Sequence, residues 1–149
     1  IADRVCERGW FGQKTSKGYY LYGEGIELFT PNPEIEMICD DERKRVGITP
    51  KNFSDQEILD RYIAAMVYEG TKILQEKIAI RPSDIDVVYT NGYGFPKWRG
   101  GPMKYADMIG LDKVLANIEK FYQEDKRFWS PPQLLNDLVN NGKNFDSLN

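Results

Sequence analysis

The chain contains no histidine. Histidine is the side chain that most often serves as general acid or base near neutral pH, and it is the commonest metal ligand. Its absence excludes Ser-His-Asp and Cys-His catalytic arrangements within this chain. Glu, Asp, Lys or Tyr can still act as acid or base, so an enzyme without histidine is conceivable. The composition nevertheless favours a role in packing or binding over catalysis.

Cysteine is also scarce, with only Cys6 and Cys39 in the whole chain. The two residues form no C-x-x-C motif, and no histidine exists to complete a zinc site. We therefore expect both to be reduced, partly buried thiols of an intracellular protein, with no metal bound.

No strong excess of charge and no long apolar run is present in the 149 residues. The net charge of -3 and the pI of about 5.1 give no electrostatic case for a nucleic-acid partner. No signal peptide, apolar membrane span or lipidation motif is evident, so no membrane partner is expected. Because the chain begins at Ile1 inside a helical pattern, we expect it to be a piece of a longer protein.

Apolar spacing and capping residues predict an all-α fold, a bundle of five or six helices with at most one short strand. One short extended segment is expected near residues 19–22, where aromatic side chains cluster. The first ten residues fit the end of a helix that stops at Gly9. The later helices are predicted at 32–47, 54–77, 81–92, 102–110, 113–124 and 131–142.

Capping signals support these helix starts. Asn32 precedes Pro33, and Ser54 with Glu57 fits a capping box. Ser83 with Asp86 resembles a second capping box, and Asp112 fits a cap for 113–124. In the 54–77 helix, Gly70 lies in an apolar stripe and permits a close approach by another element. We interpret that stripe as core; its members are Ile58, Leu59, Tyr62, Ile63, Met66, Val67, Ile73 and Leu74.

The most unusual stretch is N-G-Y-G-F-P-K-W-R-G-G-P, residues 91–102. Its glycines permit positive φ, and its prolines fix the direction of the chain. Phe95 and Trp98 are expected to be large buried anchors, and Arg99 is expected to donate hydrogen bonds to unpaired carbonyls. One interpretation is a helix-to-helix corner and the other is a ligand or partner surface. The corner is favoured because the stretch holds no catalytic group.

The run R-P-S-D-I-D followed by residues 92–111, G-Y-G-F-P-K-W-R-G-G-P-M-K-Y-A-D-M-I-G-L, resembles the C-terminal domain of 3-hydroxyacyl-CoA dehydrogenases. It is most similar to the second helical copy in multifunctional fatty-acid β-oxidation enzymes. The helix around Tyr68-Glu69-Gly70 and the run P-P-Q-L-L also fit, although Lys77 replaces a family glycine. The segment 11–20 resembles the end of the first copy, with Ser16 in place of a glycine. The matching family positions, expected to be structural or at an interface, are Gly92, Gly94, Phe95, Pro96, Arg99, Gly100, Gly101, Pro102 and Asp107.

This resemblance implies that residues 1–23 end a preceding helical domain and that 32–149 form the C-terminal domain. It also implies that catalysis and NAD binding reside in an upstream Rossmann domain of the parent, which acts on 3-hydroxyacyl-CoA and is expected to carry an enoyl-CoA hydratase too. No catalytic residue and no cofactor carries over to this chain. The expected partners are the upstream Rossmann and first helical domains, or a second copy of the fragment.

Two matters stay open from the sequence. The chain could instead be a stand-alone module for acyl-CoA or a partner; weak contacts to CoA phosphates would then come from Lys14 and Lys17, with Lys97 and Arg99 as further candidates. The C-terminal D-S-L-N is not a peroxisomal S-K-L signal, so a bacterial cytoplasmic parent is expected, with a peroxisomal parent as the alternative.

Overall fold

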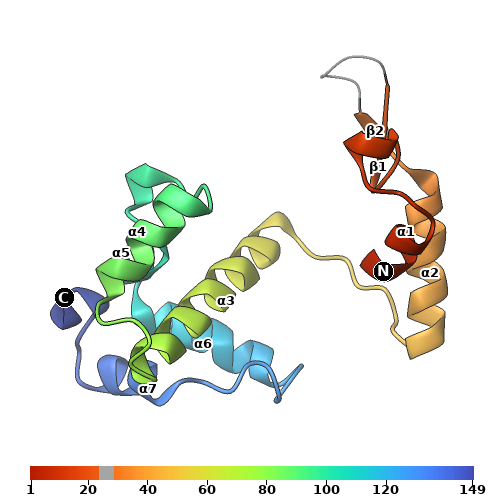
Figure 1. Ribbon diagram of the computed structural model, residues 1–149. Coiled ribbons are helices and arrows are strands. Elements are labelled where there is room, and N and C mark those ends of the chain that lie inside the picture. The colour runs from red at the N-terminus through yellow and green to blue at the C-terminus, as the bar shows by residue number, and fades with distance from the viewer. Residues whose placement is uncertain (24–28) are drawn as a thin grey trace. The chain divides into compact units, whose positions relative to one another are not determined.

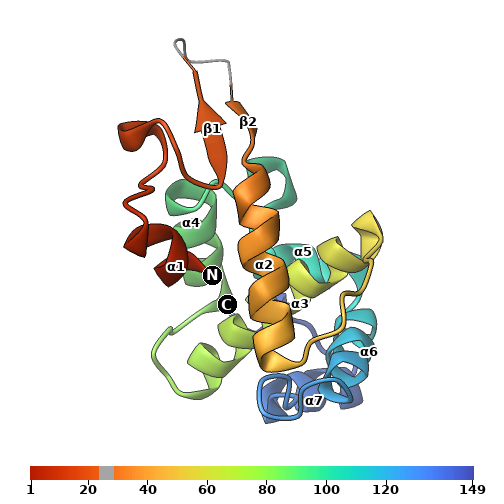
Figure 2. The ribbon, with the colours of Figure 1, turned by 90° about the vertical axis from the view of Figure 1, so that its right-hand side faces the viewer.

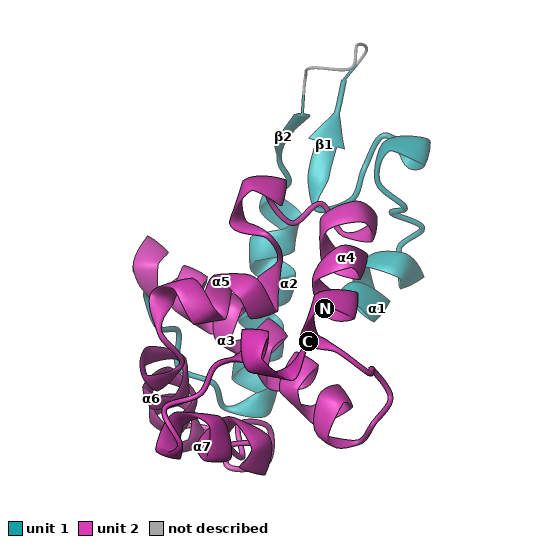
Figure 3. Ribbon diagram, turned by 90° about the vertical axis from the view of Figure 1, so that its left-hand side faces the viewer, with its two compact units in different colours: residues 1–52 teal, residues 53–149 magenta. Residues whose placement is uncertain are grey.

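A computed structural model of the chain describes residues 1–23 and 29–149, and these form two compact units, 1–52 and 53–149 (Figure 3). Within this described part, seven α-helices and one two-stranded sheet confirm the predicted all-α class. Unit 1 contains α1 (Ala2–Glu7), β1 (Tyr20–Tyr22), β2 (Phe29–Pro31) and α2 (Pro33–Val46). Unit 2 contains α3 (Asp55–Gln75), α4 (Pro82–Gly92), α5 (Pro102–Ile109), α6 (Leu111–Tyr122) and α7 (Gln133–Asn140).

Unit 1 is organised around an antiparallel pair of strands followed by one long helix (Figure 2). The expected extended segment near 19–22 is β1, and its partner β2 was not predicted. Buried Asn32 links the pair to α2: its side-chain oxygen accepts from the Glu34 N–H at 3.1 Å, and its amide donates to the Gly18 carbonyl at 2.9 Å. Lys17 adds an ion pair to Glu34 at 2.6 Å.

The division between the units falls between Asn52 and Phe53, not within the predicted seam at 23–33. Residues 24–28 of that seam lie outside the described residues. The links through Asn32 and Lys17 explain the difference, because they bind the start of α2 to the segment before the strands. The assignment of 1–23 and 32–149 to successive family domains stays a prediction.

Unit 2 is built around α3, which packs against α5, α6 and α7, while α4 pairs with α5 (Figure 1). Much of the predicted α3 stripe lies in the core, with Ile63, Met66 and Val67 buried. The start of the stripe lies outside the core, because Ile58, Leu59 and Tyr62 are exposed. Apolar periodicity marks an apolar helix face but does not say whether the chain itself covers it. The other core side chains are Ala64, Tyr68, Ile85, Phe95, Met103, Ala106, Leu111, Val114, Leu115, Ile118, Phe121, Trp129, Leu135, Leu138 and Phe145.

Gly70 confirms the expected close approach of another element to α3. A Cβ atom placed on Gly70 would lie 2.6 Å from the sulfur of Met103, well inside van der Waals contact. Met103 of α5 is completely buried at this point. The missing side chain therefore sets the distance between α3 and α5.

Two predicted caps are present and two are wrong. Asn32 caps α2, and the Ser54 hydroxyl accepts from the Glu57 N–H at 3.2 Å. Helix α4 starts at Pro82, so its capping carboxylate is Asp84 and not Asp86. Helix α6 starts directly after Gly110, which leaves Asp112 inside its first turn.

Two residues other than glycine adopt positive φ among the described residues: Ser16 at 57° and Lys77 at 60°. They occupy the two positions at which the sequence departs from glycines of the resembled family pattern. The backbone thus keeps a left-handed conformation that favours glycine, although the side chains have changed.

Candidate interaction site

The stretch 93–101 forms the corner between α4 and α5. Gly94, Gly100 and Gly101 have φ angles of 71°, 80° and 119°, all in the region that favours glycine. At Gly101 a Cβ atom would also lie 2.3 Å from the Asp86 carboxylate oxygen. The expected helix-to-helix corner is therefore present, and its sharp turn requires glycine at Gly101.

Asp86 fixes this corner from α4. Its carboxylate accepts hydrogen bonds from the backbone N–H groups of Met103 at 2.8 Å and Lys104 at 3.0 Å. These are first-turn N–H groups of α5, which have no partner within their own helix. Asp86 is only 8% exposed, and burial holds its pKa above the usual value even though both N–H donors favour the ionised form. Asp86 thus caps a neighbouring helix.

Asp107 repeats the arrangement at the other end of α5. Its carboxylate accepts from the N–H groups of Phe145 and Asp146, each at 2.9 Å, at the start of a 3₁₀ turn at Phe145–Leu148. Burial again raises the pKa of Asp107. Lys104 makes an ion pair with Asp146, which links the turn back to the start of α5. The family position Asp107 therefore has an evident structural role here.

The two expected anchors of the corner behave differently. Phe95 is 8% exposed and packs near Tyr105, with the ring centroids 6.4 Å apart. Trp98 is 77% exposed, so its assignment as a buried anchor is wrong. It lies in the short 3₁₀ turn Lys97–Arg99, whose geometry places successive side chains on different sides.

In the described part of the chain Arg99 does not make the expected hydrogen bonds to loop carbonyls, so this prediction is also wrong. Its guanidinium carbon lies 4.6 Å from the Trp98 ring centroid and 4.3 Å from that of Tyr105. Such cation–π contacts place the group over aromatic faces. The Arg99 Nε atom is buried and has no hydrogen-bond partner in the described part of the chain.

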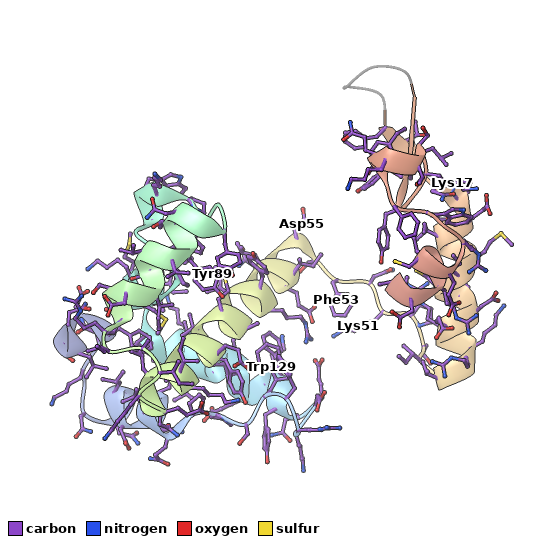
Figure 4. All side chains as sticks on the ribbon, viewed as in Figure 1. Lys17, Lys51, Phe53, Asp55, Tyr89 and Trp129 are labelled. Atoms are coloured by element: carbon purple, nitrogen blue, oxygen red, sulfur yellow. The ribbon has the colours of Figure 1, made fainter. Side chains whose placement is uncertain are left out.

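The corner borders a groove of about 310 Å³ between α3 and α4. Tyr89 projects from α4 toward α3 beside this groove (Figure 4). Burial raises the pKa of Tyr89, so its phenol is neutral near pH 7. Arg99 is the only charged residue of the lining, which consists of Leu59, Tyr62, Ile63, Tyr89, Tyr93, Gly94, Phe95, Pro96, Trp98 and Arg99.

The lining of this groove is apolar or tyrosine apart from one guanidinium. It holds no carboxylate or thiol, and the described residues contain no group of three or more His, Cys, Asp or Glu side chains able to hold a metal. Leu59, Tyr62, Tyr93 and Trp98 present exposed apolar surface around it. Surface of this kind next to a groove is typical of an interaction site.

Arg99 lines the groove, whereas the other candidates for phosphate contacts, Lys14, Lys17 and Lys97, do not. Lys14 and Lys17 belong to unit 1, whereas Lys97 and Arg99 belong to unit 2. Lys17 makes an ion pair with Glu34, and its Nζ lies 4.1 Å from the Trp10 ring centroid.

The two cysteines are free thiols: Cys39 is partly buried, as expected, and Cys6 is exposed. No helix in the described part of the chain is both long and apolar enough to cross a membrane.

The groove is not evident from the sequence. Apolar periodicity places Leu59 and Tyr62 in the core, and no pattern assigns a role to Tyr89 or Tyr93. The available signal was the cluster of tyrosines, since tyrosine suits surfaces with one apolar and one wet side.

The fold and site together define a helical domain with an apolar, arginine-bearing groove. Residues 58–146 match the model of the 3-hydroxyacyl-CoA dehydrogenase C-terminal domain. The chain belongs to this family, as the resemblance implied, and the groove and the α4–α5 corner lie within the matched region.

Known relatives include peroxisomal bifunctional enzymes and a subunit of a fatty acid oxidation complex. The chain is 46% identical to the peroxisomal bifunctional enzyme of Danio rerio over 95% of the chain and 20% of that protein. It is 42% identical to the peroxisomal bifunctional enzyme of Homo sapiens over 84% of the chain and 17% of that protein. It is 32% identical to the fatty acid oxidation complex subunit alpha of Psychrobacter sp. over 95% of the chain and 20% of that protein. The chain thus spans about a fifth of these relatives, which come from both peroxisomal and bacterial systems.

Proposed function

We propose that this chain is the non-catalytic C-terminal region of a longer 3-hydroxyacyl-CoA dehydrogenase of fatty-acid β-oxidation. In that parent, an upstream Rossmann domain binds NAD and oxidises 3-hydroxyacyl-CoA to 3-oxoacyl-CoA. The present chain supports the reaction by packing on the helical domain that precedes it. The bacterial cytoplasm remains the proposed compartment, with the peroxisome as the alternative.

The observation that carries this proposal is the uncovered apolar surface around the groove. Tyr62, Tyr93 and Trp98 are each more than half exposed, although aromatic side chains of this size bury roughly 150–250 Å² each when they are covered. A chain without histidine lacks the side chain that most often serves as general acid or base near neutral pH. The relatives are about five times longer, so the parent has ample surface to cover the groove.

The test divides the parent into two pieces and measures whether they restore activity together. A cut before Asn32 would separate α2 from the residues to which it is hydrogen-bonded, so the cut is placed between Asn52 and Phe53. NADH formation from a 3-hydroxyacyl-CoA is followed for the upstream piece alone and after addition of residues 53–149. We expect low activity alone and recovery on mixing.

A matched pair of variants shows whether recovery depends on the groove. Tyr62→Glu combined with Trp98→Glu places charge on its exposed rim and should abolish recovery. Met108→Glu changes a side chain that is 63% exposed but outside the lining, and should leave recovery intact. An upstream piece that is already fully active alone would disprove the supporting role.

A stand-alone acyl-CoA module has one observation in its favour. Lys97 and Arg99 make no ion pair within the described part of the chain, so both are available to phosphate groups. Calorimetric titration of the 149-residue chain with CoA decides this alternative. Heat of binding that disappears in Lys97→Ala would support the module, whereas absence of heat favours the packing role.

A further inference from the structure

Arg99 lies in the groove, whose lining residues include no carboxylate to pair with it. Its guanidinium lies against Trp98 and Tyr105, and its buried Nε has no hydrogen-bond partner among the residues that the structure describes. An unpaired donor at a buried position is uncommon in native proteins. The arrangement holds the guanidinium in a fixed orientation while leaving its hydrogen-bonding capacity unused.

The rest of the lining indicates what would complete the site. Apart from Arg99 it is apolar or tyrosine, with no acidic residue. A guanidinium is planar and binds a carboxylate through two parallel hydrogen bonds. The complementary occupant is therefore mostly apolar and carries one carboxylate.

The helices that flank the groove favour a protein segment as occupant. The groove is bordered by two helices, α3 and α4, an arrangement that suits a segment laid along it. About four-fifths of the relatives' length lies outside the region matched by this chain, so a covalently linked segment is available.

We propose that the groove receives an apolar segment from the remainder of the parent chain and that an Asp or Glu of this segment pairs with Arg99. This inference rests on the proposed function and deepens it, because it assigns the contact to one groove and one ion pair. Arg99 is then a recognition residue of the packing interface.

Photo-cross-linking in the full-length parent tests this proposal. The photoreactive residue p-benzoylphenylalanine is introduced at Tyr93, which is 75% exposed and lines the groove, and at Met108 as the matched control. We expect Tyr93 to cross-link within the same molecule to one upstream segment, identified by mass spectrometry, at a yield well above the control. Arg99→Glu should reduce the Tyr93 yield to the control level, and exchange of the mapped carboxylate for Arg should restore it.

Three results would overturn the ion pair: a Tyr93 yield no higher than the Met108 control, a yield unchanged by Arg99→Glu, or a cross-link between two copies of the parent. Dehydrogenase activity of the divided parent is measured separately. If activity requires residues 53–149 while Tyr93 gives no specific cross-link, the groove assignment fails and the supporting function stands. If activity is independent of 53–149, the supporting function fails whatever Tyr93 contacts.

Discussion

Replacing Asp86 by Ala tests the cap that joins α4 to α5. The variant removes both acceptors of the Met103 and Lys104 N–H groups and leaves these donors unpaired in a largely buried position. Because Asp86 is remote in sequence from the helix that it caps, the loss should separate the two helices without altering α4 itself.

The expected loss is about 2 kcal/mol of unfolding free energy, the upper end of the range for removing a helix cap. The upper end is appropriate because two donors lose a charged acceptor at 2.8 and 3.0 Å. With a urea dependence of roughly 1–2 kcal/mol per M for a small domain, the midpoint should fall by about 1–2 M.

The assay is urea unfolding of the 149-residue chain, followed by the fluorescence of buried Trp129 in unit 2. Amide hydrogen exchange supplies a local readout, since the Met103 and Lys104 amides should exchange faster in the variant. Asp84→Ala is the matched control. Asp84 caps its own helix at the surface, so its loss should cost about 1 kcal/mol or less and leave those two amides protected.

An unchanged midpoint together with unchanged protection of Met103 and Lys104 would refute the reasoning about Asp86. An equal loss of stability in Asp84→Ala and Asp86→Ala would also contradict it, because the cap on the neighbouring helix would then contribute no more unfolding free energy than the cap on its own helix.

Three further predictions follow from the same geometry. Phe95→Ala should cost about 3–5 kcal/mol in urea unfolding, whereas Trp98→Ala should change stability by less than about 0.5 kcal/mol; similar losses would contradict their different burial. Lys77→Gly should raise the unfolding free energy by about 0.5–1 kcal/mol, because the relief of left-handed backbone strain exceeds the added entropy of the unfolded chain. A lower thermal midpoint in this variant would argue against strain at Lys77. The raised pKa of Asp86 means that the folded state binds a proton more tightly, so this group's contribution to stability falls as pH rises from its unfolded pKa of about 3.9 through the folded value. The advantage of the wild type over Asp86→Asn should therefore be larger near pH 4 than near pH 7, and the opposite trend in urea midpoints would contradict the assigned shift.

Local signals predicted the helices well because they depend on neighbouring residues. The Asn32 and Ser54 caps and the glycine at position 110 act within a few residues of the helix ends that they define. The two failures have different reasons: Asp86 serves the distant helix α5, whereas Asp112 lies inside α6 because that helix starts two residues earlier than predicted. Asp86 and Met103 are 17 positions apart, and the residues between them carry no sequence pattern for that contact.

The sequence by itself determined the all-α class, most helix boundaries and the glycines of the α4–α5 corner, because periodicity, caps and positive φ are local properties. Only the tertiary structure decided which apolar side chains are covered. Phe95 and Trp98 are equally apolar in the sequence, yet one is buried and the other exposed. The groove arises where α3, α4 and the corner meet, and there the Nε of Arg99 has no hydrogen-bond partner among the described residues. Burial and pairing depend on residues brought together from distant parts of the chain.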